Sequence, residues 1–499
     1  MSDIALNSLC LFGAVKLSIG ALITLGIIGG LVIIACSFSY WRAAIKLALV
    51  VALLEGAIRK WVFPSGQELV YFLKDGLLLG AYLRVFLGEE REFRQLRMAL
   101  PTNEIQFMAL FICFCAFNPN FGSPVQGLFG IKMYFMYLPL VFVMPRLFRS
   151  EAEMVRQLSI FLWIALPICL LGFLQWRAGP NSPLNVYAWD VESGSIAHFG
   201  FGDKVRITGT FSYIAGFSVF LLYFIGLSLV LLSERKTWQP WLIVLVLLPV
   251  LLGNALMNGS RGLIIMAIIV FGVFAMAGFS GQIGMGTKFR TFLMMGVTVG
   301  FLAITYLFVD SFFYLTNRFT RSNDTVQGRA TTWHLRHLEE GIEKAGPFGY
   351  GLGISFPSSS SLASALKLPP PRERPPIMES EPGQIWLETG PLGFFSWFGI
   401  RGILIWSCLT AYRRARTPLQ RSIALLAMTI GTLYLLGHVV GSHTSNILLH
   451  ALTGLALVPM LESTAPMPRR AAALANGRLV RQPNPHAVHP AALKPPHQP

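Results

Sequence analysis

The stretch GLIIMAIIVFGVFAMAGF, from Gly262 to Phe279, decides the fold class because it contains no charged side chain. A helix of about 20 such residues crosses the ~30 Å apolar core of a bilayer. Similar runs recur along the 499-residue chain, which is 54% hydrophobic and only 13% charged, with a mean hydropathy of +0.58. Soluble domains carry about 25% charged residues, so an ordinary soluble enzyme is excluded. The sequence predicts an all-α, polytopic integral membrane protein.

The apolar windows predict about 12–14 transmembrane helices and divide the chain into five parts. The parts are an N-terminal segment (1–16), helices over 17–309 with a loop at 177–211, a large loop at 310–389, helices over 390–461 and a tail at 462–499. The tail is basic and rich in Pro and Ala, which predicts disorder. The windows lie near 17–36, 43–63, 68–87, 104–117, 128–145, 157–176, 212–232, 240–257, 262–279, 291–309, 390–410, 422–440 and 446–461.

The formal net charge of +16 suggests nucleic acid at first, but the positions of the basic residues argue against that partner. Lys and Arg fall in every second connection, whereas the alternating short connections contain only Arg261. This alternation is typical of topology rather than of a nucleic-acid surface, and it predicts that the basic connections and the C-terminus are cytoplasmic. The loops 177–211 and 310–389 are then periplasmic. The basic set comprises Arg42, Lys46, Arg91, Arg94, Arg97, Arg146, Arg149, Arg156, Arg235, Lys236, Lys288, Arg290, Arg413, Arg414, Arg416 and Arg421.

Six of the ionisable side chains inside apolar windows stand out, because a charge at membrane depth costs at least about 2.5–3.5 kcal/mol on insertion scales. Under the orientation above, all six belong to the outer half of the membrane. They read either as structural ion pairs between helices or as an outward-facing polar cavity that binds a charged group. The six are Glu55, Arg59, Lys60, Lys74, Asp75 and Lys132.

Arg261 lies at the junction N-G-S-R-G between two apolar runs. A guanidinium beside the free N–H groups of a helix start suits phosphate oxygens, although a simple turn with Arg261 in the headgroup layer is the alternative. In the large loop, residues 328–344 predict an amphipathic helix that presents Arg329. His334 and His337 have the i, i+3 spacing of metal ligands but lack a third ligand, so we expect no metal and no cofactor.

The order of five short motifs resembles the O-antigen ligase and O-antigen polymerase superfamily of bacterial inner-membrane proteins. The resemblance covers roughly residues 200–410, and an N-terminal segment adds to it. The motifs are RITGTFSY (206–213), NGSRG (258–262), GRATTW (328–333), PFGYGLG (347–353) and LETGPLGF (387–394), and the N-terminal segment is EGAIRKWVFP (55–64).

The resemblance implies a type C glycosyltransferase-like helical fold that works at the periplasmic face. Members of the family move a glycan from undecaprenyl diphosphate onto an acceptor hydroxyl, without metal and with inversion. The partners implied are a polyprenyl-diphosphate-linked glycan donor, a glycan, lipid or protein acceptor, and membrane lipids. Arginines are thought to hold the diphosphate, and these roles fall here on Arg261, Arg329 and Arg206.

One departure from the family concerns the general base. Ligases commonly carry a His-Asn pair before the L-x-E-x-G-x-x-G stretch, whereas this chain has Glu379-Ser380-Glu381 there. The base is therefore expected to be Glu381, Glu379 or His443, because carboxylate and imidazole can both accept a hydroxyl proton. Polymerase and ligase activity both stay open.

Two other functions fit the same charged residues. A transporter for an anionic solute would use the outer-half charges as its binding site, although no internal repeat is apparent in the sequence. A non-catalytic membrane component of a polysaccharide assembly complex would use them structurally.

Overall fold

The computed structural model describes residues 19–64, 67–88, 100–188, 196–199, 204–233, 242–283, 308–321, 333–356, 359–360, 363–364, 366–376 and 378–464. Within these residues the regular structure is helical, apart from one isolated bridge between His198 and Val205. The all-α prediction is confirmed for this part of the chain. The predicted segment 1–16, most of the window near 291–309, Arg329 and the tail beyond 464 lie outside the described residues.

The chain divides into two units, Met1–Ser463 and Thr464–Pro499, and the helices described here belong to the first, with α21 ending at the boundary. Their order is α1 (Ile19–Ser39), α2 (Trp41–Ala57), η1 (Ile58–Val62), α3 (Gln67–Leu87), α5 (Thr102–Phe114), η3 (Cys115–Phe117), α6 (Pro124–Phe135), α7 (Leu140–Val143), η4 (Met144–Arg146), α8 (Glu151–Trp163), α9 (Ala165–Arg177), α10 (Ile214–Ser233), η5 (Ile243–Leu247), α12 (Leu248–Asn258), α13 (Arg261–Phe279), α15 (Val309–Arg321), α16 (Trp333–Lys344), α18 (Glu381–Arg414), α19 (Pro418–Leu433), α20 (His443–Ala456) and α21 (Val458–Thr464).

Six helical segments among the described residues are long and apolar enough to cross a membrane. Three shorter apolar helical segments accompany them. The chain is therefore an all-helical protein with several candidate membrane spans, and the finer count of 12–14 stays a prediction. The six are Pro124–Arg146, Glu151–Arg177, Ile214–Ser233, Arg261–Phe279, Glu381–Arg414 and His443–Leu461.

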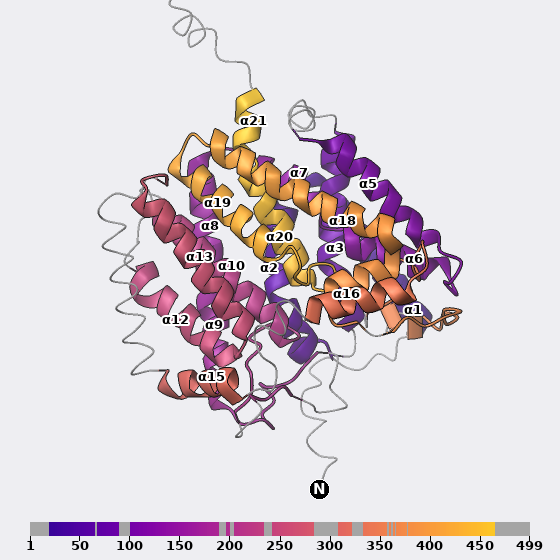
Figure 1. Ribbon diagram of the computed structural model, residues 1–499, viewed down its shortest axis with the longest axis horizontal. Helices are drawn as coiled ribbons and strands as arrows, with labels where there is room; N and C mark the ends of the chain where they lie inside the picture. The colour runs from indigo at the N-terminus through magenta and orange to yellow at the C-terminus, as the bar shows by residue number, and fades with distance from the viewer. Residues whose placement is uncertain are drawn as a thin grey trace, which may run out of the picture. The chain divides into compact units, whose positions relative to one another are not determined.

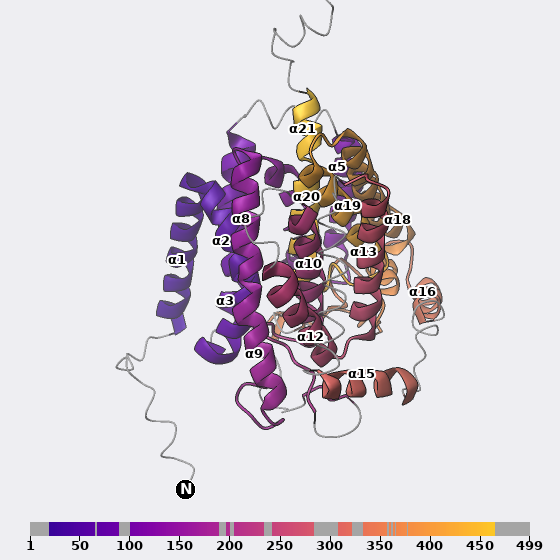
Figure 2. The ribbon, with the colours of Figure 1, turned by 90° about the vertical axis from the view of Figure 1, so that its left-hand side faces the viewer.

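The helices α10 and α20 occupy the centre of this unit (Figures 1 and 2). In each, 83% of the apolar window is buried inside the protein, against 33% for α13. Most of the α13 window is therefore not buried by other parts of the protein, as expected for a helix whose apolar side chains contact lipid.

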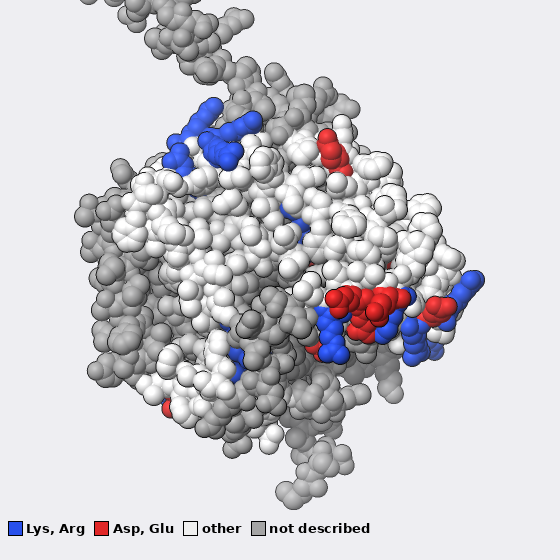
Figure 3. Space-filling model, in the orientation of Figure 1, with Lys and Arg blue, Asp and Glu red and all other residues white. Residues whose placement is uncertain are grey.

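The connections sort into two sets at opposite ends of the long helices. At one end, Arg42 donates to the carbonyl of Arg146 at 3.3 Å and Lys46 pairs with Glu153 at 3.1 Å. In Figure 3, exposed basic side chains gather where α18 meets α19, charged side chains of both signs gather near α16, and mostly uncharged surface lies between. The alternation of basic and non-basic connections stays a prediction, because Arg91, Arg94, Arg97, Arg235, Lys236, Lys288 and Arg290 lie outside the described residues. The end that includes Arg42 and Arg146 is called the basic end below.

Local sequence explains where several of these helices begin. The hydroxyls of Ser260, Ser380 and Ser442 accept backbone N–H groups at the starts of α13, α18 and α20. Such N-caps satisfy donors that have no partner inside the helix. Gly259 ends α12 in the left-handed conformation at φ 67°, so the NGS triplet both stops one helix and starts the next.

The long helix α18 differs from its prediction because it begins at Glu381 rather than near residue 390. The predicted boundary coincides instead with a break inside the helix at Gly390, whose φ of 64° and ψ of −173° are essentially restricted to glycine. Just before this break, the PFGYGLG and LETGPLGF motifs contact each other. The Tyr350 and Gly351 N–H groups donate to the Leu387 and Glu388 carbonyls.

Replacing Gly390 with alanine is expected to destabilise the protein by about 1–3 kcal/mol from backbone strain alone. An added Cβ would also lie 2.2 Å from the Pro347 carbonyl oxygen, which forces the 347–353 loop away. Thermal unfolding in detergent measures the loss. Gly402→Ala is the matched control on the same helix, because no atom lies within 4 Å of its added Cβ. Equal unfolding temperatures for the two variants would contradict the glycine-specific conformation of residue 390 and its contact with the 347–353 loop.

Candidate functional site

A cavity of about 460 Å³ opens at the end of the bundle opposite to the basic end. Its walls come from α2 and η1, from the start of α3, from the segment before α10 and from the segment that enters α20. The N-termini of α10 and α20 both border it, which adds a positive potential to the cavity. The residues that line it are Ala52, Glu55, Gly56, Arg59, Tyr71, Phe211, Ser212, Tyr213, Ala215, Gly216, Phe356, Gly441, Ser442, His443 and Thr444.

The π-helical turn η1 sets the basic side chains of this wall. The Phe63 N–H donates to the Ile58 carbonyl, five residues back, which widens the turn at the end of α2. Within this turn, Arg59 pairs with Glu55 at 3.4 Å. The Lys60 ammonium donates to the Thr208 hydroxyl at 2.9 Å and to the Gly209 carbonyl at 3.1 Å. The EGAIRKW segment therefore clamps the RITGTFSY segment.

The structure brings five of the six ionisable residues of the apolar windows into one buried network, whereas Lys60 contacts the RITGTFSY segment instead. Lys74 reaches the second oxygen of Glu55 at 2.5 Å, and Lys132 pairs with Asp75 at 3.0 Å. The Tyr137 hydroxyl donates to the other oxygen of Asp75 at 2.8 Å. Three basic side chains thus surround two carboxylates, an arrangement that favours an additional anion.

Tyr71 lies between this network and His443. Its ring is within 3.8 Å of the Lys132 ammonium and within 4.6 Å of the Lys74 ammonium, measured to the ring centroid. Its hydroxyl forms a short hydrogen bond with Nε2 of His443 and donates to Met133 Sδ at 3.6 Å. Nδ1 of His443 is buried and has no hydrogen-bond partner among the described residues, so an acceptor hydroxyl reaches it only when neighbouring side chains move. If Nε2–H donates to the phenol oxygen, Nδ1 keeps a lone pair that can accept a proton.

Glu381, the first of the predicted bases, has structural partners instead of a place in the cavity. It is fully buried, pairs with Arg401 at 2.7 Å, and accepts the backbone N–H groups of Val439 and Val440. Arg401 also donates to the carbonyls of Tyr434 at 2.5 Å and Gly437 at 3.2 Å. This ion pair therefore fixes the 434–442 segment that leads into His443.

Glu379 and His443, the other two predicted bases, differ in where they lie. Glu379 is exposed and does not line the cavity, whereas His443 does. The geometry therefore favours His443 for the proton-accepting role.

Glu388 is a buried acid that the sequence reasoning did not select. One carboxylate oxygen accepts the Tyr134 hydroxyl at 2.7 Å and the Gly353 N–H at 2.9 Å. The other accepts the Ser355 N–H at 3.0 Å and its hydroxyl at 2.6 Å. Three of these bonds hold the loop that ends at Phe356 in the cavity wall, and the fourth joins α6 to α18. The signal available in the sequence was a carboxylate in the largely apolar stretch that follows Glu381.

Arg206 and Arg261 lie together at the α12–α13 junction. Arg206 donates to the Asn258 carbonyl at 3.0 Å. Burial, and then the charge of Arg318, lower the pKa of the Arg206 guanidinium to about 10, and the Arg261 charge acts in the same direction. Arg206 remains charged at neutral pH, and the guanidinium groups of Arg261 and Arg318 both lie within electrostatic range of it. This set of Arg206, Arg261 and Arg318 is called the arginine cluster.

An apolar groove of about 390 Å³ lies beneath α15, next to the arginine cluster. Its walls are side chains of α12, α13 and α15, and Thr316 is the one polar residue in the lining. Figure 2 shows α15 lying crosswise to α13. α15 leaves Phe312 and Phe313 more than half exposed while also carrying Arg318, as a helix at a membrane surface does.

Comparison with known proteins identifies no family for this chain, so the class of protein rests on the fold alone. No family model, curated protein sequence or solved structure matches the chain. Within the described residues, no group of three or more His, Cys, Asp or Glu side chains is placed to hold a metal ion. The chain is an α-helical protein with candidate membrane spans and a charged cavity at one end.

Proposed function

We propose that this protein is a membrane enzyme that transfers a glycan from a polyprenyl diphosphate to an acceptor hydroxyl, as a polysaccharide polymerase or ligase. The observation that carries the proposal is the adjacency of two sites of different chemistry. One combines the arginine cluster with an apolar groove, which suits a lipid-linked diphosphate. The other is the open cavity with His443, which suits an acceptor. Tyr213 lines the cavity and also influences the Arg206 pKa, so it connects the two.

In this mechanism the acceptor oxygen attacks the anomeric carbon of the donor glycan while the bond from that carbon to the diphosphate oxygen breaks. The proton of the acceptor hydroxyl passes to Nδ1 of His443. The guanidinium groups stabilise the negative charge that grows on the leaving diphosphate. Single displacement at the anomeric carbon inverts its configuration. The reaction is metal-independent in the family that the chain resembles.

The proposal includes the finer topology predicted from the sequence. The protein resides in the bacterial inner membrane with about 12–14 transmembrane helices, a cytoplasmic C-terminus and its site at the periplasmic face. The positions of the site and of the exposed basic side chains at opposite ends of the bundle support this orientation. Reactivity of a single cysteine introduced beside the cavity towards a membrane-impermeant reagent would test it.

Arg261→Ala and Arg206→Ala are each expected to lower glycan transfer at least about 100-fold, the size of effect seen when a donor to a developing charge is removed. The measurement is the fate of lipid-linked glycans in a deletion strain complemented with each variant. Single repeat units would accumulate for a polymerase, and long lipid-linked chains for a ligase.

Arg413→Ala is the matched control, since Arg413 is exposed at the opposite end of α18 from the site. Wild-type product in both site variants would refute the proposal. Accumulation of an anionic solute in proteoliposomes without glycan turnover would favour the transporter instead.

A further inference from the structure

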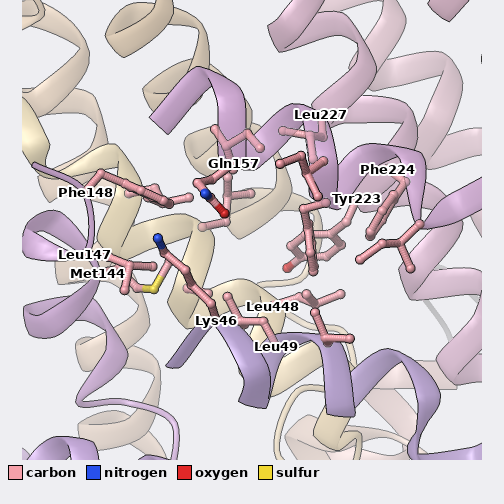
Figure 4. Close-up of a pocket in the computed structure, with 18 of the residues that line it drawn as sticks. Lys46, Leu49, Met144, Leu147, Phe148, Gln157, Tyr223, Phe224, Leu227 and Leu448 are labelled. Atoms are coloured by element: carbon pink, nitrogen blue, oxygen red, sulfur yellow. The ribbon is translucent and has the colours of Figure 1, made fainter. Parts of the chain in front are cut away.

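A second, largely apolar pocket of about 140 Å³ lies towards the basic end of the bundle, away from the proposed active site (Figure 4). Its walls come from α2, α8, α10, α19, α20 and the η4 segment. Only three of the lining residues carry polar side chains, namely Lys46, Gln157 and Tyr223. Figure 4 shows Lys46 and Gln157 reaching into the same side of the pocket, with Tyr223 on the facing wall.

Two independent observations indicate an occupant with both polar and apolar parts. The Tyr223 side chain is only 6% exposed, and its hydroxyl has no hydrogen-bond partner in the described part of the chain. A buried hydroxyl without a partner is unfavourable, and a ligand oxygen would relieve the cost. At the mouth, the Lys46 side chain is 30% exposed and its ammonium contacts Glu153 at 3.1 Å; Arg42 on the same helix and Arg149 just before α8 belong to the same end of the bundle.

We propose that this pocket binds one anionic glycerophospholipid of the surrounding bilayer. The phosphate lies at Lys46 and Gln157, an ester carbonyl accepts the Tyr223 hydroxyl, and one acyl chain fills the apolar remainder. Charge complementarity selects the headgroup, because each basic side chain near a membrane surface favours an anionic lipid about fivefold. The proposal does not depend on glycan transfer.

The experiment uses the full chain in nanodiscs that contain phosphatidylcholine and phosphatidylglycerol, and native mass spectrometry counts the lipids that stay bound. The wild type is expected to retain one phosphatidylglycerol in preference to phosphatidylcholine. Ile160→Trp narrows the mouth and should abolish the retention. Leu170→Trp is the matched control, because Leu170 is 53% exposed, like Ile160 at 52%, but does not line the pocket.

A pair of charge variants separates lipid binding from the ion pair itself. Lys46→Gln should lower the preference for phosphatidylglycerol about fivefold. Glu153→Gln removes the same ion pair but frees the ammonium, so it should keep or raise the preference. Equal retention of the two lipids by the wild type, or unchanged retention in Ile160→Trp, would overturn the proposal. Retention of a polyprenyl phosphate in place of the phospholipid would overturn it as well.

Discussion

Glu381→Ala is expected to destabilise the protein by about 3–5 kcal/mol, because it leaves the Arg401 charge buried without its carboxylate. Both side chains are nearly inaccessible, at 0% and 6% exposure. The substitution also removes the acceptor of the Val439 and Val440 N–H groups. Thermal unfolding of the purified protein in detergent measures the loss. Activity should fall with it, since the released segment carries His443.

The double variant Glu381→Met with Arg401→Met separates the charge from the packing. Replacing a buried ion pair by apolar side chains of similar volume is often close to neutral, so the double variant should be more stable than Glu381→Ala. Recovery should be incomplete, because two backbone N–H groups and the Tyr434 carbonyl still lose their partners.

Glu381→Gln decides between a positioning residue and a general base. An amide oxygen can still accept the Val439 and Val440 N–H groups, so the variant should retain more stability than Glu381→Ala. Its activity should then follow the amount of folded protein. A variant as stable as the wild type but at least about 100-fold less active would instead identify Glu381 as the base.

The sequence predicts the fold better than it predicts the site, for physical reasons. An apolar window reflects what a bilayer requires of each helix separately, so most windows coincide approximately with described helices. The end of α19 is one exception, because the helix stops at Leu433 whereas its window runs to 440. The start of α18 is another. The first turn of α18 can contain a charged side chain because it is buried against protein, where Arg401 offsets the charge of Glu381.

Partners that are distant in sequence explain what the windows could not predict. Tyr71 meets His443 across 372 residues, and Glu388 meets Tyr134 across 254. Five of the six selected charges lie in one network because α2, α3 and α6 pack together, which no local pattern specifies. Arg401 was not selected, although a guanidinium inside an apolar window calls for a buried partner.

Removing the imidazole in His443→Ala is expected to lower glycan transfer by about 10²–10⁴-fold, the usual contribution of a positioned general base. Tyr71→Phe should cause a smaller loss, because the phenol orients the imidazole through Nε2 without itself accepting the substrate proton. Thr444→Val is the matched control, as Thr444 lines the same cavity without a titratable group. The measurement is the initial rate of transfer with purified, lipid-linked donor.

Chemical rescue distinguishes a proton acceptor from a residue that only shapes the wall. The cavity of about 460 Å³ is open and has room for a free imidazole in place of the missing ring of His443→Gly. Added imidazole should then restore part of the rate in His443→Gly but none in Arg261→Ala, whose lost charge it does not replace at the diphosphate. If imidazole restored none of the rate while His443→Gly were as stable as the wild type, the acceptor of the substrate proton would be a group other than His443. Because Glu379 is exposed and Glu381 is held by Arg401, that acceptor would be Glu55, whose side chain lines the same cavity, or a group of the substrate itself.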